Sequence, residues 1–260
     1  MPRLVASDVD GTLLDNQGRL SRRTIAAVRA LTDTGLVFVL VTARPPRWMH
    51  DLTEVVSDHG VALCSNGAFV YDVARGVVMS ERTLARHSVL ELVTALRREV
   101  PGIGFAVESA NGFAREPSYA DVHPRPPGTR TADVEELLDD LPGKLLARAP
   151  DLDGEQFLKT VTDVVGDAAV VAYSGASGLA EISAAGVTKA AVLAEWAAER
   201  DVAADQVWAF GDMPNDLPML EWAGTAFAVG NAHRDVVAAA SYVVGDNDHD
   251  GVAEVLELIV

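Results

Sequence analysis

Short apolar runs alternate with amphipathic segments near both ends of the chain. In the first part, the pattern predicts strands and helices at Leu4–Val9, Ser21–Thr34, Val37–Thr42, after Pro45-Pro46, and at Val61–Cys64. In the last part it predicts a helix at Lys189–Arg200 and strands at Val207–Phe210, Ala226–Val229 and Tyr242–Val244. This alternation is typical of right-handed βαβ units around a parallel sheet that is buried on both faces.

Between residues 84 and 183 the pattern changes to that of an α+β segment. The helices expected there are His87–Val100, Ala132–Asp139 and Gly154–Val165. The strands expected there are Gly104–Val107, Gly112–Arg115, Leu145–Arg148, Ala169–Tyr173 and Leu179–Ser183. The proline-rich stretch Pro117–Pro127 is expected to be a loop. The sequence therefore predicts an α/β domain formed by 1–83 and 184–260, with an α+β domain inserted at 84–183.

Composition and charge restrict the function. The chain has 260 residues, of which 49% are hydrophobic, and a formal net charge of −17. Such a charge disfavours nonspecific binding to nucleic acids or to anionic membranes, and an anionic substrate must be captured by local cations. No apolar run approaches the roughly 18 residues that span a bilayer. With Cys64 as the only cysteine, an intramolecular disulfide is impossible, so we expect a soluble cytoplasmic protein.

Two acidic clusters follow predicted strands. The first is Asp8-Val9-Asp10-Gly11-Thr12, and the second contains Asp212, Asn215 and Asp216. Both come where a strand ends, which is the sheet edge at which ligands bind in open α/β folds. Close carboxylates repel one another unless a cation lies between them, and oxygen ligands favour Mg²⁺ before Ca²⁺. A solvated Asp-Gly turn and a helix cap are the structural alternatives for the two clusters taken singly.

Two further positions could hold an anion. Thr42 ends a predicted strand just before a helix, so its hydroxyl and the N–H groups that follow could bind phosphate. Lys189 follows Thr188, a plausible helix N-cap, and would offer a point charge to phosphate. Taken alone, a threonine at a strand end is usually structural and a lysine on a helix is usually solvated.

In chain order, these residues resemble the four motifs of the haloacid dehalogenase-like (HAD) phosphohydrolases. The similarity extends to further short stretches that match the Cof-type branch, namely Ser65–Ala68, Met219-Leu220, Ala223-Gly224, Gly230–Ala232 and Asp250–Ala253. The resemblance implies a Rossmann-like three-layer core with a parallel sheet. It also implies that the inserted segment is a type-2 cap domain that determines substrate specificity.

For the reaction, the resemblance implies an aspartyl-phosphate mechanism that requires Mg²⁺. Asp8 would be the nucleophile, ionised near pH 7. Asp10 would be the general acid and then the general base, and its backbone carbonyl would bind the metal. Asp212 would be a metal ligand, and Asp216 would support the site directly or through water.

Phosphate binding is implied for a second set of residues. Thr42, the N–H of Ala43 and the ammonium of Lys189 would hold the phosphoryl oxygens, and Asn215 would orient the phosphate or Lys189. Ala43 and Ala190 stand where the family commonly has glycine. An alanine forced to a positive φ would cost on the order of 1 kcal/mol, which concerns Ala43 most.

Three functions are compatible with these residues. The first is a phosphatase acting on a small phosphorylated metabolite such as a sugar phosphate. The second is a phosphotransferase or mutase that uses the same aspartyl-phosphate, and the third is a noncatalytic phosphometabolite-binding protein, which the intact acidic residues disfavour. Candidates for contacts with the leaving group in the cap, or for ordinary loop packing there, are Glu108, Arg115, Tyr119, His123 and Arg125. The sequence singles out neither a substrate nor an oligomeric state.

Overall fold

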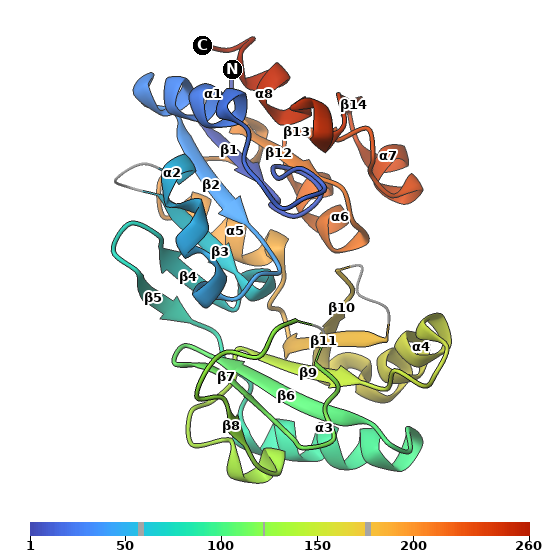
Figure 1. Cartoon of the computed structure of the whole chain (residues 1–260). Helices are drawn as coiled ribbons and strands as arrows, with labels where there is room; N and C mark the ends of the chain where they lie inside the picture. The colour runs from blue at the N-terminus through green and yellow to red at the C-terminus, as the bar shows by residue number, and fades with distance from the viewer. Residues whose placement is uncertain (57–59, 122, 175–177) are drawn as a thin grey trace. The chain divides into compact units, whose positions relative to one another are not determined.

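The computed structural model describes residues 1–56, 60–121, 123–174 and 178–260. The chain forms two compact units, of which the first contains 1–80 and 188–260 and the second contains 81–187 (Figure 1). The predicted limits of the inserted segment, 84 and 183, lie a few residues inside those of the second unit.

The first unit is built on an eight-stranded sheet with the order β14-β13-β12-β1-β2-β3-β4-β5. Its strands are β1 (Leu4–Ser7), β2 (Val37–Val41), β3 (Val61–Cys64), β4 (Phe69–Asp72), β5 (Val77–Glu81), β12 (Val207–Gly211), β13 (Thr225–Ala228) and β14 (Tyr242–Val243). The six strands from β14 to β3 are parallel, as predicted. At one edge β4 pairs antiparallel with β3, a strand pair that the sequence did not predict. Only the four residues 65–68 separate these two strands, and the first three of them form a 3₁₀ turn, whereas a parallel pair needs a long crossover.

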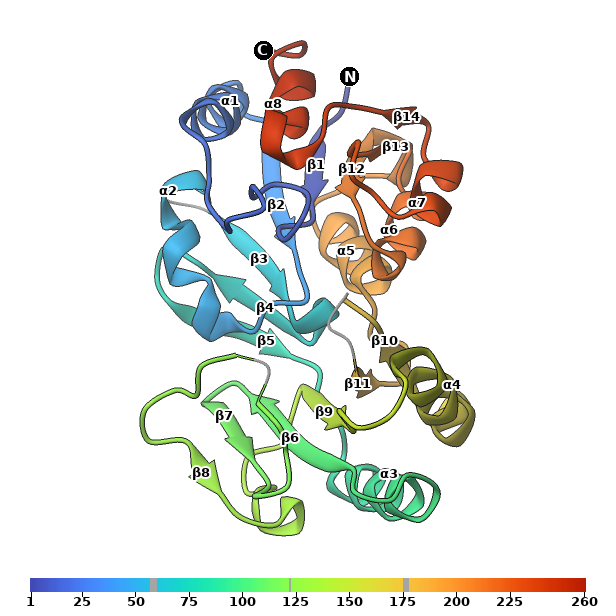
Figure 2. The same cartoon turned by 45° about the vertical axis from the view of Figure 1, so that its right-hand side comes forward.

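Helices cover the two faces of this sheet. They are α1 (Arg22–Asp33), α2 (Thr53–Val56), α5 (Lys189–Ala198), α6 (Leu217–Trp222), α7 (Arg234–Ala239) and α8 (Gly251–Leu256). Figures 1 and 2 show α8 beside α1, and α5, α6 and α7 grouped together. Leu4 and Ala6 of β1 pack with residues of α5 and α6, and strand alternation turns the equally buried Val5 to the opposite face. The central strands are therefore buried on both faces, as their apolar runs predicted.

Helix α1 illustrates how local signals set these elements. The hydroxyl of Ser21 accepts a hydrogen bond from the N–H of Thr24 at 2.9 Å and so caps the N-terminus of the helix. The sequence predicted a helix after Pro45-Pro46 without giving its length. Two 3₁₀ turns, at Pro46–Trp48 and His50–Leu52, precede the single turn of α2.

The second unit is a six-stranded sheet with the order β10-β11-β9-β6-β7-β8. Its elements are α3 (Arg86–Glu99), β6 (Gly104–Ser109), β7 (Gly112–Arg115), β8 (Arg130–Thr131), β9 (Lys144–Arg148), α4 (Gly154–Val165), β10 (Ala169–Ala172) and β11 (Leu179–Ala184). Apolar residues of α3 and α4 form one core with the sheet.

The prediction of a helix at Ala132–Asp139 was wrong. One 3₁₀ turn at Val134–Glu136 already buries Val134, Leu137 and Leu138, so a longer helix would bury no further apolar side chain of this segment.

The stretch 117–127, as far as the structure describes it, contains neither helix nor strand, as predicted. None of the helices within the described residues combines the length and the apolar character that crossing a membrane requires.

Candidate active site

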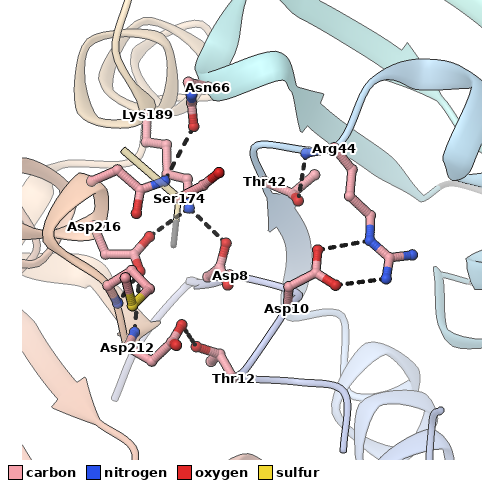
Figure 3. A network of polar contacts seen from close by, with 12 residues as sticks. Asp8, Asp10, Thr12, Thr42, Arg44, Asn66, Ser174, Lys189, Asp212 and Asp216 are labelled. Carbon is pink, nitrogen blue, oxygen red and sulfur yellow. Dashed lines mark hydrogen bonds and ion pairs between the residues drawn. The ribbon is translucent and has the colours of Figure 1, made fainter. Parts of the chain in front are cut away.

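Loops at the carboxyl ends of neighbouring parallel strands bring the predicted residues together. Asp8 follows β1, Thr42 follows β2 and Asp212 follows β12, and β1 lies between the other two strands. Lys189 is the first residue of α5, and the hydroxyl of its N-cap, Thr188, accepts a hydrogen bond from the helix at 3.1 Å. Figure 3 shows the side chains of Asp8, Lys189 and Asp212 converging from these separate elements.

Three carboxylates and one ammonium group form the centre of the site. One oxygen from each of Asp8, Asp212 and Asp216 lies within 4.8 Å of the others, and all three residues are buried. The Nζ atom of Lys189 lies 2.6 Å from Oδ1 of Asp8 and 2.6 Å from Oδ1 of Asp216. Lys189 itself is only 2% exposed. One buried cation therefore bridges two of three buried anions.

The charges in this cluster do not balance. Burial raises the pKa of Asp8 well above its usual range; the charge of Lys189 lowers it again in part, and the carboxylate of Asp216 raises it further. Burial, followed by the charge of Asp216, raises the pKa of Asp212 to about 6. Burial lowers the pKa of Lys189, but the carboxylates of Asp216 and Asp8 outweigh it and the net direction is upward. The ammonium is thus firmly charged, and a further cation beside Asp8 and Asp212 would favour the ionised forms of these two carboxylates.

Asp212 and Asp216 accept different hydrogen bonds, which indicates different roles for their carboxylates. Oδ2 of Asp216 accepts from the backbone N–H groups of Asp212, at 3.1 Å, and Met213, at 3.0 Å. Oδ1 of Asp212 accepts from the hydroxyl of Thr12 at 2.8 Å. Among the described residues, no hydrogen bond reaches Oδ2 of Asp8 or Oδ2 of Asp212. These two oxygens are therefore the ones open to a metal ion, which suits the hard oxygen ligation of Mg²⁺.

Gly11 allows the loop after β1 to lie close to the loop after β12. Gly11 has a φ of +78°, and a Cβ atom placed there would lie 2.4 Å from Oδ2 of Asp212. Only a residue without a side chain fits this conformation and this space. The backbone at Gly11 can therefore lie directly against the carboxylate of Asp212.

The carboxylate of Asp10 lies outside the cluster and pairs with Arg44. Its two oxygens accept from Nε and Nη2 of Arg44 at 2.7 and 2.6 Å (Figure 3). Thr42 is buried, and its hydroxyl accepts from the N–H of Arg44 at 3.0 Å.

Positive φ angles occur among the described non-glycine residues at Ser65, Asn66, Asp201 and Asp250 only. Ala43 and Ala190 are therefore free of the backbone strain that was considered from the sequence.

Asn215 lies beside a residue to which the sequence assigned no role. Its Nδ2 donates to Oδ1 of Asn66 at 3.3 Å, and the N–H of Asn66 donates to the backbone carbonyl of Thr42 at 2.9 Å. The buried Oδ1 of Asn215 has no hydrogen-bond partner among the described residues. Thr12 ends the first acidic cluster and Asn66 lies within Ser65–Ala68, one of the stretches similar to the Cof-type branch, so their positions in the sequence were the available signals. Arg44 follows Thr42 by two residues, which was its only signal.

The candidate specificity residues lie in the second unit. Arg115 and Arg125 both pair with Asp121, at 2.7 and 2.9 Å. Tyr119 is buried near the guanidinium of Arg115, and Glu108 is also buried. Arg115, Tyr119 and Arg125 thus each contact another residue of the second unit.

Comparison with known proteins gives one consistent family. A model for haloacid dehalogenase-like hydrolases matches residues 5–256. Pyridoxal phosphate phosphatase YbhA of Escherichia coli is 29% identical, with 97% of this chain and 96% of the relative covered. The Bacillus subtilis protein 5-amino-6-(5-phospho-D-ribitylamino)uracil phosphatase YcsE is 26% identical, with 98% and 94% covered.

Solved structures agree with this result. The HAD phosphatase BT1666 from Bacteroides thetaiotaomicron has a TM-score of 0.82 at 25% identity, with 99% of this chain and 95% of that chain covered. SMU.1108c from Streptococcus mutans has the same fold, with a TM-score of 0.88 at 22% identity and 100% and 99% covered. Since the family model spans nearly the whole chain and the relatives are phosphatases, this protein belongs to the haloacid dehalogenase-like hydrolases, in their Cof-type branch, and is a phosphoric monoester hydrolase.

Proposed function

We propose that this chain hydrolyses a small phosphorylated metabolite in a Mg²⁺-dependent reaction through an aspartyl-phosphate on Asp8. The observation that carries the proposal is the buried contact of Asp8 with Lys189, at 2.6 Å, beside the carboxylates of Asp212 and Asp216. A nucleophilic carboxylate and a charge that attracts phosphate are thereby held at one point, as phosphoryl transfer requires.

In the first step, a carboxylate oxygen of Asp8 attacks phosphorus while the bond to the leaving oxygen breaks. The acid form of Asp10 gives its proton to that leaving oxygen, so that an alcohol departs. In the second step, Asp10 takes a proton from water as the water oxygen attacks phosphorus and the bond to Asp8 breaks. Inorganic phosphate is released and both carboxyl groups return to their starting states.

Phosphate binding is assigned to the hydroxyl of Thr42, the N–H of Ala43 and the ammonium of Lys189. In a chain with a net charge of −17, such local groups are needed to hold an anion. Charge develops on the equatorial oxygens in the transition state, where fixed donors stabilise it most. Asn215 is proposed to orient the phosphate or Lys189; its buried Oδ1, which has no partner among the described residues, is an acceptor and so suits the ammonium of Lys189 rather than a phosphate oxygen.

The residues present suit a bound Mg²⁺. Asp8 and Asp212 would hold it through the oxygens that accept no other hydrogen bond, together with the backbone carbonyl of Asp10. Both oxygens of Asp216 already accept hydrogen bonds, so we assign it a supporting role. When bound, the ion supplies positive charge that lets an anionic nucleophile approach an anionic phosphate.

The substrate class can be tested directly. The named phosphatase relatives act on pyridoxal phosphate and on a phosphoribityl compound. Purified protein should be tested for phosphate release from these two compounds and from a panel of sugar phosphates, with Mg²⁺ and with a chelator. We expect release from at least one of them with Mg²⁺ and none with chelator. Absence of release from the whole panel would refute the proposal.

The same assay separates hydrolysis from phosphoryl transfer to a second hydroxyl. A mutase would convert one sugar phosphate into its isomer without free phosphate, whereas a phosphatase releases phosphate in proportion to the alcohol formed. We place the activity in the cytoplasm, since a single buried cysteine, Cys64, suits a reducing compartment.

A further inference from the structure

Asp10 is held by a two-point ion pair that the proposed reaction does not by itself require. Nε and Nη2 of Arg44 donate to separate oxygens of the carboxylate, at 2.7 and 2.6 Å. The Arg44 side chain is 17% exposed, whereas that of Asp10 is 57% exposed. A carboxylate so open to solvent would otherwise sample several rotamers. Two parallel hydrogen bonds from a planar group fix both its position and its plane.

Arg44 is itself fixed from both sides of its backbone. Its N–H donates to the hydroxyl of Thr42 at 3.0 Å, and its carbonyl accepts from the N–H of Ser65 at 2.8 Å. The segment that carries Arg44 is thus tied to the predicted phosphate-binding threonine and to the turn that follows β3.

That turn has an unusual backbone. Ser65 and Asn66 have φ angles of 52° and 57°, and Gly67 has a φ of 104°. Serine adopts the left-handed region only at an energetic cost, so the surrounding contacts must maintain it. One such contact is the hydrogen bond from Asn66 to the backbone of Thr42, at 2.9 Å. A strained turn therefore holds the loop from which Arg44 extends.

We propose that Arg44 is a positioning residue for Asp10, and that it directs the Asp10 carboxyl toward the leaving-group oxygen in the first step. This inference rests on the proposed function. Arg44 makes and breaks no covalent bond, and the proton still passes from Asp10 to the leaving oxygen. In the acid form of Asp10, the protonated oxygen turns its proton toward the leaving oxygen, while the other oxygen continues to accept a hydrogen bond from Arg44.

A purely structural ion pair of the same kind provides the comparison. Arg23 on α1 donates to both carboxylate oxygens of Glu257, which follows α8, at 2.8 and 2.6 Å. Neither residue belongs to the site. An Arg23→Ala variant therefore removes an ion pair of equal geometry without altering Asp10.

The test compares leaving groups. An alkyl phosphate needs protonation of its leaving oxygen, whereas p-nitrophenyl phosphate has a leaving group stable as an anion. The ratio kcat/KM reports on the first phosphoryl transfer, so it isolates the acid step from the later attack of water. We expect Arg44→Ala to lower kcat/KM by about 10- to 100-fold for the alkyl phosphate. The loss for p-nitrophenyl phosphate should be much smaller.

Three further variants complete the test. The double variant Arg44→Ala/Asp10→Asn should be no slower than Asp10→Asn alone, because Arg44 acts through Asp10. Arg44→Lys keeps the charge but loses the planar two-point contact, so it should recover only part of the alkyl phosphate activity. Arg23→Ala should match the wild type on both substrates, which shows whether a lost ion pair alone affects turnover.

The outcomes separate this inference from the function on which it rests. Equal losses on both substrates in Arg44→Ala, or losses that multiply with those of Asp10→Asn, would overturn the positioning role while phosphatase activity stands. Unchanged alkyl phosphate activity in Asp10→Asn would remove Asp10 as the acid, and the role of Arg44 with it. A wild-type protein that hydrolyses neither substrate with Mg²⁺ would overturn both proposals.

Discussion

The ammonium of Lys189 lies 2.6 Å from a carboxylate oxygen of Asp8, although the two residues are 181 positions apart in the chain. The same ammonium lies 2.6 Å from Asp216. All three side chains are almost fully buried. A lysine that is withdrawn from water is kept charged by the anions beside it, and the anions in turn depend on the lysine. This mutual dependence links the stability of the site to its chemistry.

Replacing Lys189 by methionine should destabilise the metal-free protein. Asp8, Asp212 and Asp216 would then be buried without a compensating cation, and breaking a buried ion pair in this way costs about 3–5 kcal/mol. Urea unfolding with chelator present measures the loss, and Mg²⁺ should restore part of it. The control is Lys159→Met, which removes the exposed pair with Asp163 and should cost only about a few tenths of a kcal/mol. Equal effects of the two substitutions would contradict the argument.

Replacing Asp8 by asparagine should separate activity from stability. The variant removes one of three close carboxylates, while Lys189 keeps its contact with Asp216. We expect turnover to fall by at least about 10³-fold, since no nucleophile remains. The urea midpoint should be unchanged or higher, because burial of a destabilising charge is relieved. Binding of Mg²⁺ should remain measurable in this variant. Retained full activity would exclude Asp8 as the nucleophile.

The main features of the core were predictable because they depend on local patterns. The apolar runs at β1, β2, β3 and β12 predict strands that are buried on both faces, and parallel strands place their carboxyl ends at one edge. The proximity of Asp8, Thr42 and Asp212 follows from that topology. The β4 strand was missed because a hairpin after β3 leaves no helical pattern to mark it.

The contacts among side chains were less predictable. No sequence pattern states that Arg44 pairs with Asp10, that Thr12 donates to Asp212, or that Asn66 adopts a left-handed conformation. Each of these depends on the distance between two loops, and a distance of this kind is set by the packing of the whole sheet. The wrong prediction of a helix at 132–139 has a similar cause. The apolar spacing of this segment is typical of a helix, but tertiary packing buries its apolar side chains from a 3₁₀ turn instead.

The acidic cluster should make the metal-free protein less stable as pH rises through the range from about 4 to about 6. The pKa of Asp212 is raised from 3.8 to about 6, chiefly by burial. Between these values the folded state holds a proton that the unfolded state has released, so the free energy of unfolding falls as pH increases. The loss attributable to this group is about 2–3 kcal/mol.

Urea unfolding at a series of pH values with chelator tests this expectation. An Asp212→Asn variant should show a flatter dependence across the same range. Mg²⁺ binds the ionised carboxylates, so its stabilising effect should be larger at about pH 7.5 than at about pH 5. A wild-type stability that rises steadily through this interval would contradict the assigned direction.

Gly11 and Gly18 have similar backbone conformations, so they can be compared to test whether the close contact of Gly11 with Asp212 matters for metal binding. Gly11 and Gly18 have φ angles of +78° and +73°, so alanine at either position imposes a similar strain of about 1 kcal/mol. A Cβ at Gly11 would lie 2.4 Å from Oδ2 of Asp212, whereas a Cβ at Gly18 has no atom within 4 Å. Gly11→Ala should therefore displace a proposed metal-binding oxygen, and Gly18→Ala should not.

The expected difference appears in the Mg²⁺ dependence of activity. Gly11→Ala should raise the Mg²⁺ concentration for half-maximal turnover by about tenfold or more, which corresponds to about 1.4 kcal/mol of lost binding. Gly18→Ala should lower the urea midpoint without changing that concentration. Because both variants carry the backbone strain, only contact with Asp212 distinguishes them. Identical Mg²⁺ dependence in the two proteins would mean that the Asp212 carboxylate, as placed against Gly11, takes no part in holding the metal.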